Sequence, residues 1–169
     1  MMNQKALHTL EFEKIRERLE AFAGSEPGKE LCRRLSPMSH IEDIRLAQKE
    51  TSDALARTVH NGPLSFSGVS DIKDVLKRLE IGAVLSIPEL LRLKRLMEAC
   101  ARAKAYGKGG AQEELSDSLT ESFQLLEPLT PLSQEIGRCI VSEEELSDDA
   151  SPALRRVRRS MRLTGDRIH

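Results

Sequence analysis

At 169 residues the chain is long enough for one domain with a buried core, and 39% hydrophobic but only 3% aromatic residues favour an aliphatic, helical core. The net charge of −1 excludes a general polycation, so any affinity for nucleic acid must come from a local patch. Cys32, Cys100 and Cys139 form no CxxC pair, which argues against a disulfide framework or zinc site and indicates a reducing compartment.

The first two predicted helices are amphipathic. Apolar residues between Leu7 and Phe22 recur at helical spacing, and the sequence predicts a break near residues 9–12. The beginning of the chain is charged too early for a signal peptide, and no apolar run approaches the roughly 20 residues that cross a bilayer. A further short helix is expected after the first two, from a cap at Ser25 to a stop at Pro37. We expect a soluble, cytoplasmic protein without membrane contacts.

Two S-x-x-E sequences, at residues 39–42 and 86–89, are typical of capping boxes. In such a box the serine side chain accepts a bond from the N3 amide, and the glutamate reaches back to the cap. The first box predicts the start of a helix that ends at Asn61-Gly62. A loop over residues 62–71 and a helix over residues 72–82 precede the second box, which opens another helix.

The next part of the chain is less regular. Residues 106–114 (YGKGGAQEE) predict a flexible, glycine-rich connection. Helices are expected at about 113–126 and 131–140, the second with a proline in its first turn. The acidic segment 142–149 (SEEELSDD) predicts a loop, a tight hairpin or a short extended pair.

These elements predict an all-α fold. We expect a compact helical bundle over residues 1–149, with at most a small β-hairpin near residues 139–148. Residues 150–169 are predicted to form a protruding terminal helix.

That terminal stretch, ASPALRRVRRSMRLTGDRIH, combines an apolar seam with many arginines. Ser151 predicts the cap, Pro152 suits the first position, and the seam has the 3, 4, 3, 4 spacing of a heptad. The seam consists of Leu154, Val157, Met161, Thr164 and Ile168. The candidate nucleic-acid-binding residues on the other faces are Arg155, Arg156, Arg158, Arg159 and Arg162, with Arg167 beyond them.

The arginines have two explanations. They could meet phosphates, in which case binding would weaken with salt. Alternatively they are the charged outside of an arm and pair with acidic neighbours such as Glu143 to Glu145. The second explanation is favoured, because no aromatic residues interleave with the arginines to stack bases.

No catalytic, cofactor or metal site is predicted in this chain. The stretch GSEPGKE (24–30) departs from a P-loop, because it has three residues between its glycines and Glu30 after the lysine. The acidic run at 143–149 lacks a calcium-loop pattern. The four histidines share no ligand spacing: His8, His40, His60 and His169.

Four segments taken in order resemble the N-terminal region of a known family. They are LHTLEFEKIRERLEAFAGSEPGKELCRRLSP (7–37), ETSDALARTV (50–59), DIKDVLKRLEIGAVLSIPELLRL (71–93) and ASPALRRVRR (150–159). The family is the type II MutS family, the bacterial MutS paralogue that lacks the mismatch-reading domain and carries a C-terminal Smr endonuclease domain. The loop at 106–114 is of variable type, and the chain has no paired lever helix.

The resemblance implies a core domain over residues 1–149 and the start of the lever that leads to a DNA clamp. It implies a parent protein that is a homodimeric ATPase using ATP and magnesium at a downstream site, with an endonuclease domain that cleaves nucleic acid. DNA and the ribosome with its rRNA are the implied partners of that parent. Recombination suppression, repair and ribosome rescue are its implied roles. The chain itself holds no matching catalytic residues, so it is expected to be a non-enzymatic element coupled to the rest of the polypeptide. The alternatives are an autonomous nucleic-acid-binding module or a helical protein dimerising through residues 154–168.

Overall fold

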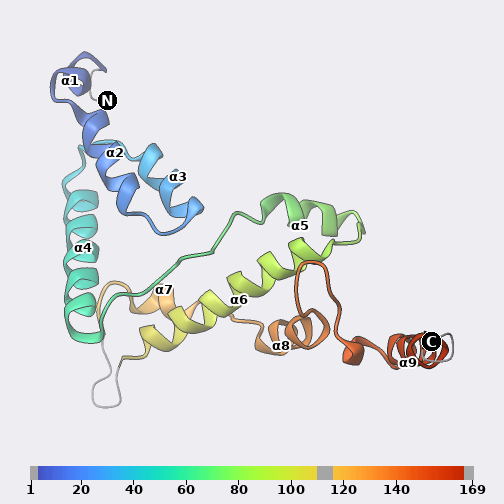
Figure 1. Ribbon diagram of the computed structural model, residues 1–169. Helices are drawn as coiled ribbons and strands as arrows, with labels where there is room; N and C mark the ends of the chain where they lie inside the picture. The colour runs from blue at the N-terminus through green and yellow to red at the C-terminus, as the bar shows by residue number, and fades with distance from the viewer. Residues whose placement is uncertain (1–3, 110–115, 166–169) are drawn as a thin grey trace. The chain divides into compact units, whose positions relative to one another are not determined.

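The computed structural model describes residues 4–109 and 116–165, and these residues form α-helices, one 3-10 helix and no strand. The predicted all-α class is therefore confirmed (Figure 1). An isolated antiparallel bridge between Ile140 and Leu146 is the one extended pairing in the described part of the chain, within the segment where at most a small hairpin was expected. The elements are α1 (Gln4–Thr9), α2 (Phe12–Phe22), α3 (Glu26–Arg34), α4 (Ile41–Asn61), α5 (Lys73–Glu80), α6 (Ile87–Gly107), α7 (Thr120–Gln124), α8 (Thr130–Cys139), η1 (Asp148–Ala150) and α9 (Pro152–Gly165).

Contacts group the chain into two units. The first unit takes in residues up to 71 together with 99–128, and the second takes in 72–98 together with the chain from 129. Helix α6 contributes to both units, with its first part in the second unit and its last part in the first. The division into a core at 1–149 and a lever from 150 stays a prediction. Among the described helices, none is both long and apolar enough to cross a membrane.

Helices α1, α2 and α3 form the start of the first unit. The predicted break between the first two is confirmed at Glu11, whose φ of 54° places it in the left-handed region. Helix α3 begins as expected, because the Ser25 hydroxyl accepts a bond of 3.2 Å from the Gly28 amide. Helices α2 and α3 pack together, and Arg33 of α3 pairs with Glu20 of α2 at 2.6 Å.

Helix α4 begins one residue later than its sequence motif indicates. Its N-cap is His40, without a side-chain cap bond, so the capping box predicted at residues 39–42 is wrong. The glutamate of that motif, Glu42, instead pairs with Arg45 at 3.1 Å. The predicted end is confirmed, since the helix stops at Asn61 and Gly62 follows with a φ of 78°.

Helix α7 is shorter than the helix predicted at 113–126, of which residues 113–115 lie outside the described residues. Side-chain bonds hold the backbone before α7 in a turn. The Ser118 amide and hydroxyl both donate to Asp53 of α4, at 3.0 and 2.6 Å. The Leu119 amide donates to the Asp117 carboxylate at 3.0 Å. These bonds compete with the helical backbone pattern, so the helix starts only at Thr120.

A buried arginine joins α4 to this turn. Arg57 is 2% exposed, and its Nε and Nη2 donate to the two carboxylate oxygens of Asp117 at 2.5 and 2.8 Å. Its Nη1 donates to the Gly107 carbonyl at 3.2 Å, at the end of α6. Its guanidinium carbon lies 5.0 Å from the centre of the Phe123 ring, in cation–π geometry. Through these three contacts, Arg57 joins α4 to the end of α6 and to α7 within the first unit.

This pair makes the first unit sensitive to acid. The hydrogen bond from Arg57 lowers the pKa of Asp117 from 3.8 to about 2. A carboxyl whose pKa is lower in the folded state stabilises the fold above its unfolded pKa and loses this contribution as the pH falls through its folded pKa. We expect the free energy of unfolding to fall by about 2 kcal/mol between about pH 5 and pH 2 from this group alone. Urea unfolding across this range should show a flatter acid dependence for Asp117→Asn, and an unchanged dependence would contradict the assignment.

The second unit has a small aliphatic core. Met97, Ile136 and Ile140 are buried, and five partly buried side chains pack against them: Ile87, Leu90, Leu91, Leu93 and Cys139. The glutamate half of the capping box predicted at residues 86–89 is present, since the Ser86 amide donates to Glu89 Oε2 at 2.8 Å. The Ser86 hydroxyl donates to the same carboxylate oxygen at 2.8 Å, whereas the predicted box has it accept from the Glu89 amide. Helix α8 begins and ends one residue before the predicted range 131–140, and it has the predicted proline in its first turn.

Candidate functional site

Helix α9 begins at a turn that is held by hydrogen bonds. The predicted cap is confirmed, because the Ser151 hydroxyl accepts from the Leu154 amide at 3.1 Å. Before it, the Ser147 amide donates to the Cys139 carbonyl at 2.8 Å, and Arg138 donates to the Asp149 carbonyl. These bonds connect the end of α8 to η1 and α9, so the start of α9 is anchored within the second unit.

Three arginines of α9 pair with the two aspartates of η1. Arg158 Nη1 lies 2.5 Å from Asp148 Oδ1, and Arg162 Nη2 lies 2.8 Å from Asp148 Oδ2. Arg155 pairs with Asp149. The bond from Arg158, with a further contribution from Arg162, lowers the pKa of Asp148, so this carboxylate is ionised at neutral pH. We call Asp148 and Asp149 the brace aspartates and their three partners the paired arginines.

These partners differ from those that the sequence indicated. No α9 arginine contacts Glu143 to Glu145 within the described residues, and Glu143 lies 4.0 Å from Arg95 of α6. The brace aspartates immediately precede α9, so they reach its first three turns, whereas the glutamates sit in the preceding turn. Arg158 also donates to the Leu146 carbonyl at 2.9 Å, which adds a backbone contact to the brace.

The other two candidate arginines pair with no carboxylate in the described part of the chain. Arg156 Nε donates weakly to the Pro152 carbonyl of its own helix at 3.4 Å. Arg159 makes no side-chain bond to another described residue, and both arginines are exposed. We call Arg156 and Arg159 the open arginines.

The apolar seam of α9 lacks a cover among the described residues. Val157 and Met161 are 56% and 68% exposed, whereas Leu154 is partly buried. Ile168, the last seam position, and the neighbouring Arg167 lie outside the described residues. A partner helix along this seam, from the same polypeptide or from a second copy, stays a prediction.

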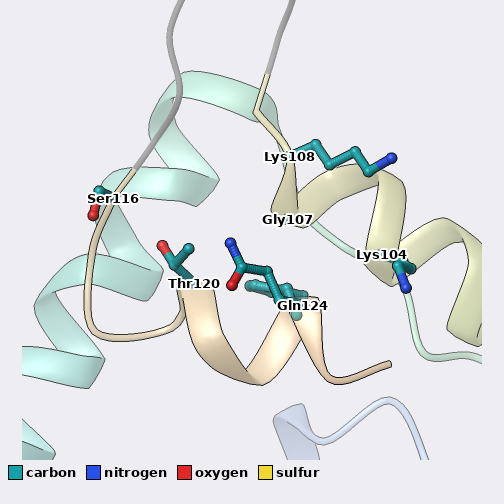
Figure 2. Close-up of a pocket in the computed structure, with 7 residues that line it drawn as sticks. Lys104, Gly107, Lys108, Ser116, Thr120 and Gln124 are labelled. Atoms are coloured by element: carbon teal, nitrogen blue, oxygen red, sulfur yellow. The ribbon is translucent and has the colours of Figure 1, made fainter. Parts of the chain in front are cut away.

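A hollow of about 470 Å³ lies beside the end of α6 in the first unit, where the sequence predicted the loop at 106–114 between two helices. Figure 2 shows Lys104, Gly107 and Lys108 on one side and Ser116, Thr120 and Gln124 on the other. Lys104 Nζ donates to the Leu126 carbonyl at 2.7 Å, so its charge is directed to the backbone. Among the described residues that line this hollow there is no carboxylate or imidazole that could act as an acid or base. Across residues 4–109 and 116–165, no three His, Cys, Asp or Glu side chains gather as metal ligands.

Comparison with known proteins gives a consistent set of relatives. No family model matches the chain. A protein named Endonuclease MutS2 from Lachnoclostridium phytofermentans is 53% identical over 99% of the chain. Proteins of the same name from Agathobacter rectalis and Acetivibrio thermocellus are 44% and 39% identical, again over 99% of the chain. The chain spans 22%, 21% and 21% of the length of these three relatives.

Proposed function

We propose that this chain is the structural core that couples an ATPase to a lever and a DNA clamp. The chain matches a segment of the MutS2 proteins, which form the type II MutS family. In this proposal the second unit holds the start of α9 in a fixed direction, and α9 is the beginning of the lever. Movement driven by nucleotide in the remainder of the polypeptide would then reach a distant clamp through packed helices.

The observation that carries this proposal is the brace at the start of α9. A lever transmits movement only if its base cannot pivot independently. Here η1 and α9 are linked by the brace aspartates, by the Ser151 cap and by the bond from Arg158 to the Leu146 carbonyl. The bond from Arg138 to the Asp149 carbonyl extends this network to α8. The network therefore supports a base that moves as one piece.

Exposed apolar side chains support the remainder of the polypeptide as the main partner. Phe22 and Val84 are each 87% exposed, and Ile81 is 83% exposed. Large apolar residues in such numbers are typical of surfaces that pack against other protein. A homodimer, DNA and the ribosome with its rRNA are proposed as partners of the whole protein, which would act in the bacterial cytoplasm.

The chemistry of the whole protein is proposed to lie outside this chain. ATP and magnesium would serve an ATPase site, and nucleic acid would be cut by an endonuclease domain. The stretch 24–30 does not fit a nucleotide site, because it contains the capped start of α3, where the Gly28 amide donates to the Ser25 hydroxyl. We therefore derive no catalytic step for the described residues.

The coupling role predicts a selective defect in the whole protein. Replacing both brace aspartates by asparagine (Asp148→Asn with Asp149→Asn) should lower nucleic-acid-stimulated ATP hydrolysis by roughly threefold or more while basal hydrolysis is unchanged. The physical reason is that α9 loses three ion pairs at its base. Steady-state ATPase assays with and without DNA measure the effect.

The matched control is Glu143→Gln with Glu144→Gln, which removes the same charge from the same segment without touching α9. An equal loss of stimulation in this control, or no loss in the aspartate variant, would count against the coupling role. The 169-residue chain alone should hydrolyse neither ATP nor nucleic acid, and turnover by the pure chain would overturn the proposal.

A further inference from the structure

The arginines of α9 lie on one side of the helix at high density. They are Arg155, Arg156, Arg158, Arg159 and Arg162. At 1.5 Å per residue these charges occupy about 10 Å, or roughly one per 2 Å, and at 100° per residue they fall within an arc of about 160°. Duplex nucleic acid carries one phosphate per about 1.7 Å of its axis, so the two charge densities are similar. The apolar seam occupies the opposite side of the helix.

Three of these five arginines already pair with a carboxylate of the same chain, which occupies the place that the phosphate of a bound ligand would take. A guanidinium binds carboxylate and phosphate through the same planar fork of N–H donors. Asp148 uses both of its oxygens, one for Arg158 and one for Arg162. The paired arginines are thus held in the arrangement that two neighbouring anionic groups would require, while the open arginines remain accessible.

We propose that α9 binds the phosphodiester backbone of duplex nucleic acid and that the brace aspartates act as internal competitors for it. The open arginines make the first phosphate contacts, and the paired arginines join only when phosphate displaces Asp148 and Asp149. A duplex is favoured over a single strand because residues 138–165 contain no aromatic side chain on which bases could stack. This inference goes beyond the coupling role and adds a condition to it: the brace aspartates fix the base of α9 only while no phosphate occupies the paired arginines.

The salt dependence of binding tests the proposal. Fluorescence anisotropy of the 169-residue chain with a labelled DNA duplex of about 20 base pairs should be measured from about 25 to about 150 mM salt. With two open arginines, the slope of log K against log salt should be about −2. The variant Asp148→Asn with Asp149→Asn should bind about tenfold more tightly at the lowest salt, with a slope near −4 to −5.

Two further variants make the result specific. Replacing both open arginines (Arg156→Gln with Arg159→Gln) should abolish binding by the otherwise unchanged chain. The charge-matched control Glu143→Gln with Glu144→Gln should tighten binding by no more than about twofold, with an unchanged slope. Far-UV circular dichroism should confirm equal helix content in all variants.

Duplex RNA should follow the same pattern as duplex DNA, and single strands of either kind should bind more weakly. The proposal is overturned if the aspartate variant binds no more tightly than the glutamate control, if its slope is unchanged, or if single strands bind as well as duplexes. None of these readouts involves ATP hydrolysis, so they test binding by α9 apart from the coupling role.

Discussion

Replacing Arg57 by alanine is expected to destabilise the first unit by about 3–5 kcal/mol, the largest effect of any single substitution that we anticipate. The side chain is 2% exposed, and its removal would leave the Asp117 carboxylate partly buried without its counter-charge. The Gly107 carbonyl would lose its donor, and the Phe123 ring would lose its cation. One substitution therefore weakens the joining of α4, α6 and α7.

The chain carries its own probe for this experiment. Tyr106 is its only tyrosine and tryptophan is absent, so intrinsic fluorescence reports on the first unit. The Tyr106 ring lies 5.9 Å from the Phe123 ring, next to the buried pair. Urea unfolding followed by this fluorescence should show a much lower midpoint for Arg57→Ala.

Two controls separate burial from charge. Arg45→Ala removes an exposed arginine from the same helix, where its partner is Glu42, and should change the free energy of unfolding by at most about 0.5 kcal/mol. The double variant Arg57→Met with Asp117→Leu should regain much of the loss, because no unpaired charge remains buried. Equal midpoints for Arg57→Ala and Arg45→Ala would contradict the importance of the buried pair.

Local signals in the sequence predicted most of the helices but not this pair. Arg57 lies in an amphipathic stretch that looks ordinary, and its partner Asp117 is 60 residues away along the chain. Hydrophobic periodicity describes which face of a helix is buried, but it does not identify a charged residue on that face or its distant partner. The same turn explains why α7 is short, since Asp117 and Asp53 bind the backbone before it.

The two S-x-x-E sequences show how an identical local motif can have two outcomes. Glu89 is buried and also pairs with Arg78 of α5, so the second box is fixed by a tertiary contact. Glu42 is exposed and has only Arg45, three residues away on its own helix. The motif alone contributes too little to choose the helix start, and the surrounding structure decides.

The candidate site at the start of α9 could likewise be predicted only in part from the sequence. The start of α9 was predictable, because a serine cap and a proline in the first turn are signals that operate over three or four residues. That its arginines meet acidic neighbours was also expected. The identity of those neighbours depended on the course of residues 140–149, where the Ile140–Leu146 bridge and η1 place the brace aspartates, and not the glutamates, against the helix.

Gly107→Ala should be the second most damaging substitution, although the sequence presents this residue as part of a flexible loop. A Cβ at this position would lie 2.2 Å from Phe123 Cβ and 2.6 Å from Cγ, far inside contact distance. The Phe123 ring cannot move away freely, because it packs on Arg57 and Tyr106. We expect a loss of about 1–3 kcal/mol, typical of an overpacked site, measured by urea unfolding with Tyr106 fluorescence.

Gly24→Ala is the matched control in the same unit, because a Cβ there meets no atom within 4 Å and its backbone needs no positive φ. Its midpoint should equal or slightly exceed that of the unchanged chain. If Gly107→Ala were equally harmless, α6 and α7 could not be packed as closely as the 2.2 Å between a Cβ at residue 107 and Phe123 Cβ requires. The bond from Arg57 to the Gly107 carbonyl depends on the same close approach, so this glycine and the buried arginine are two requirements of one junction.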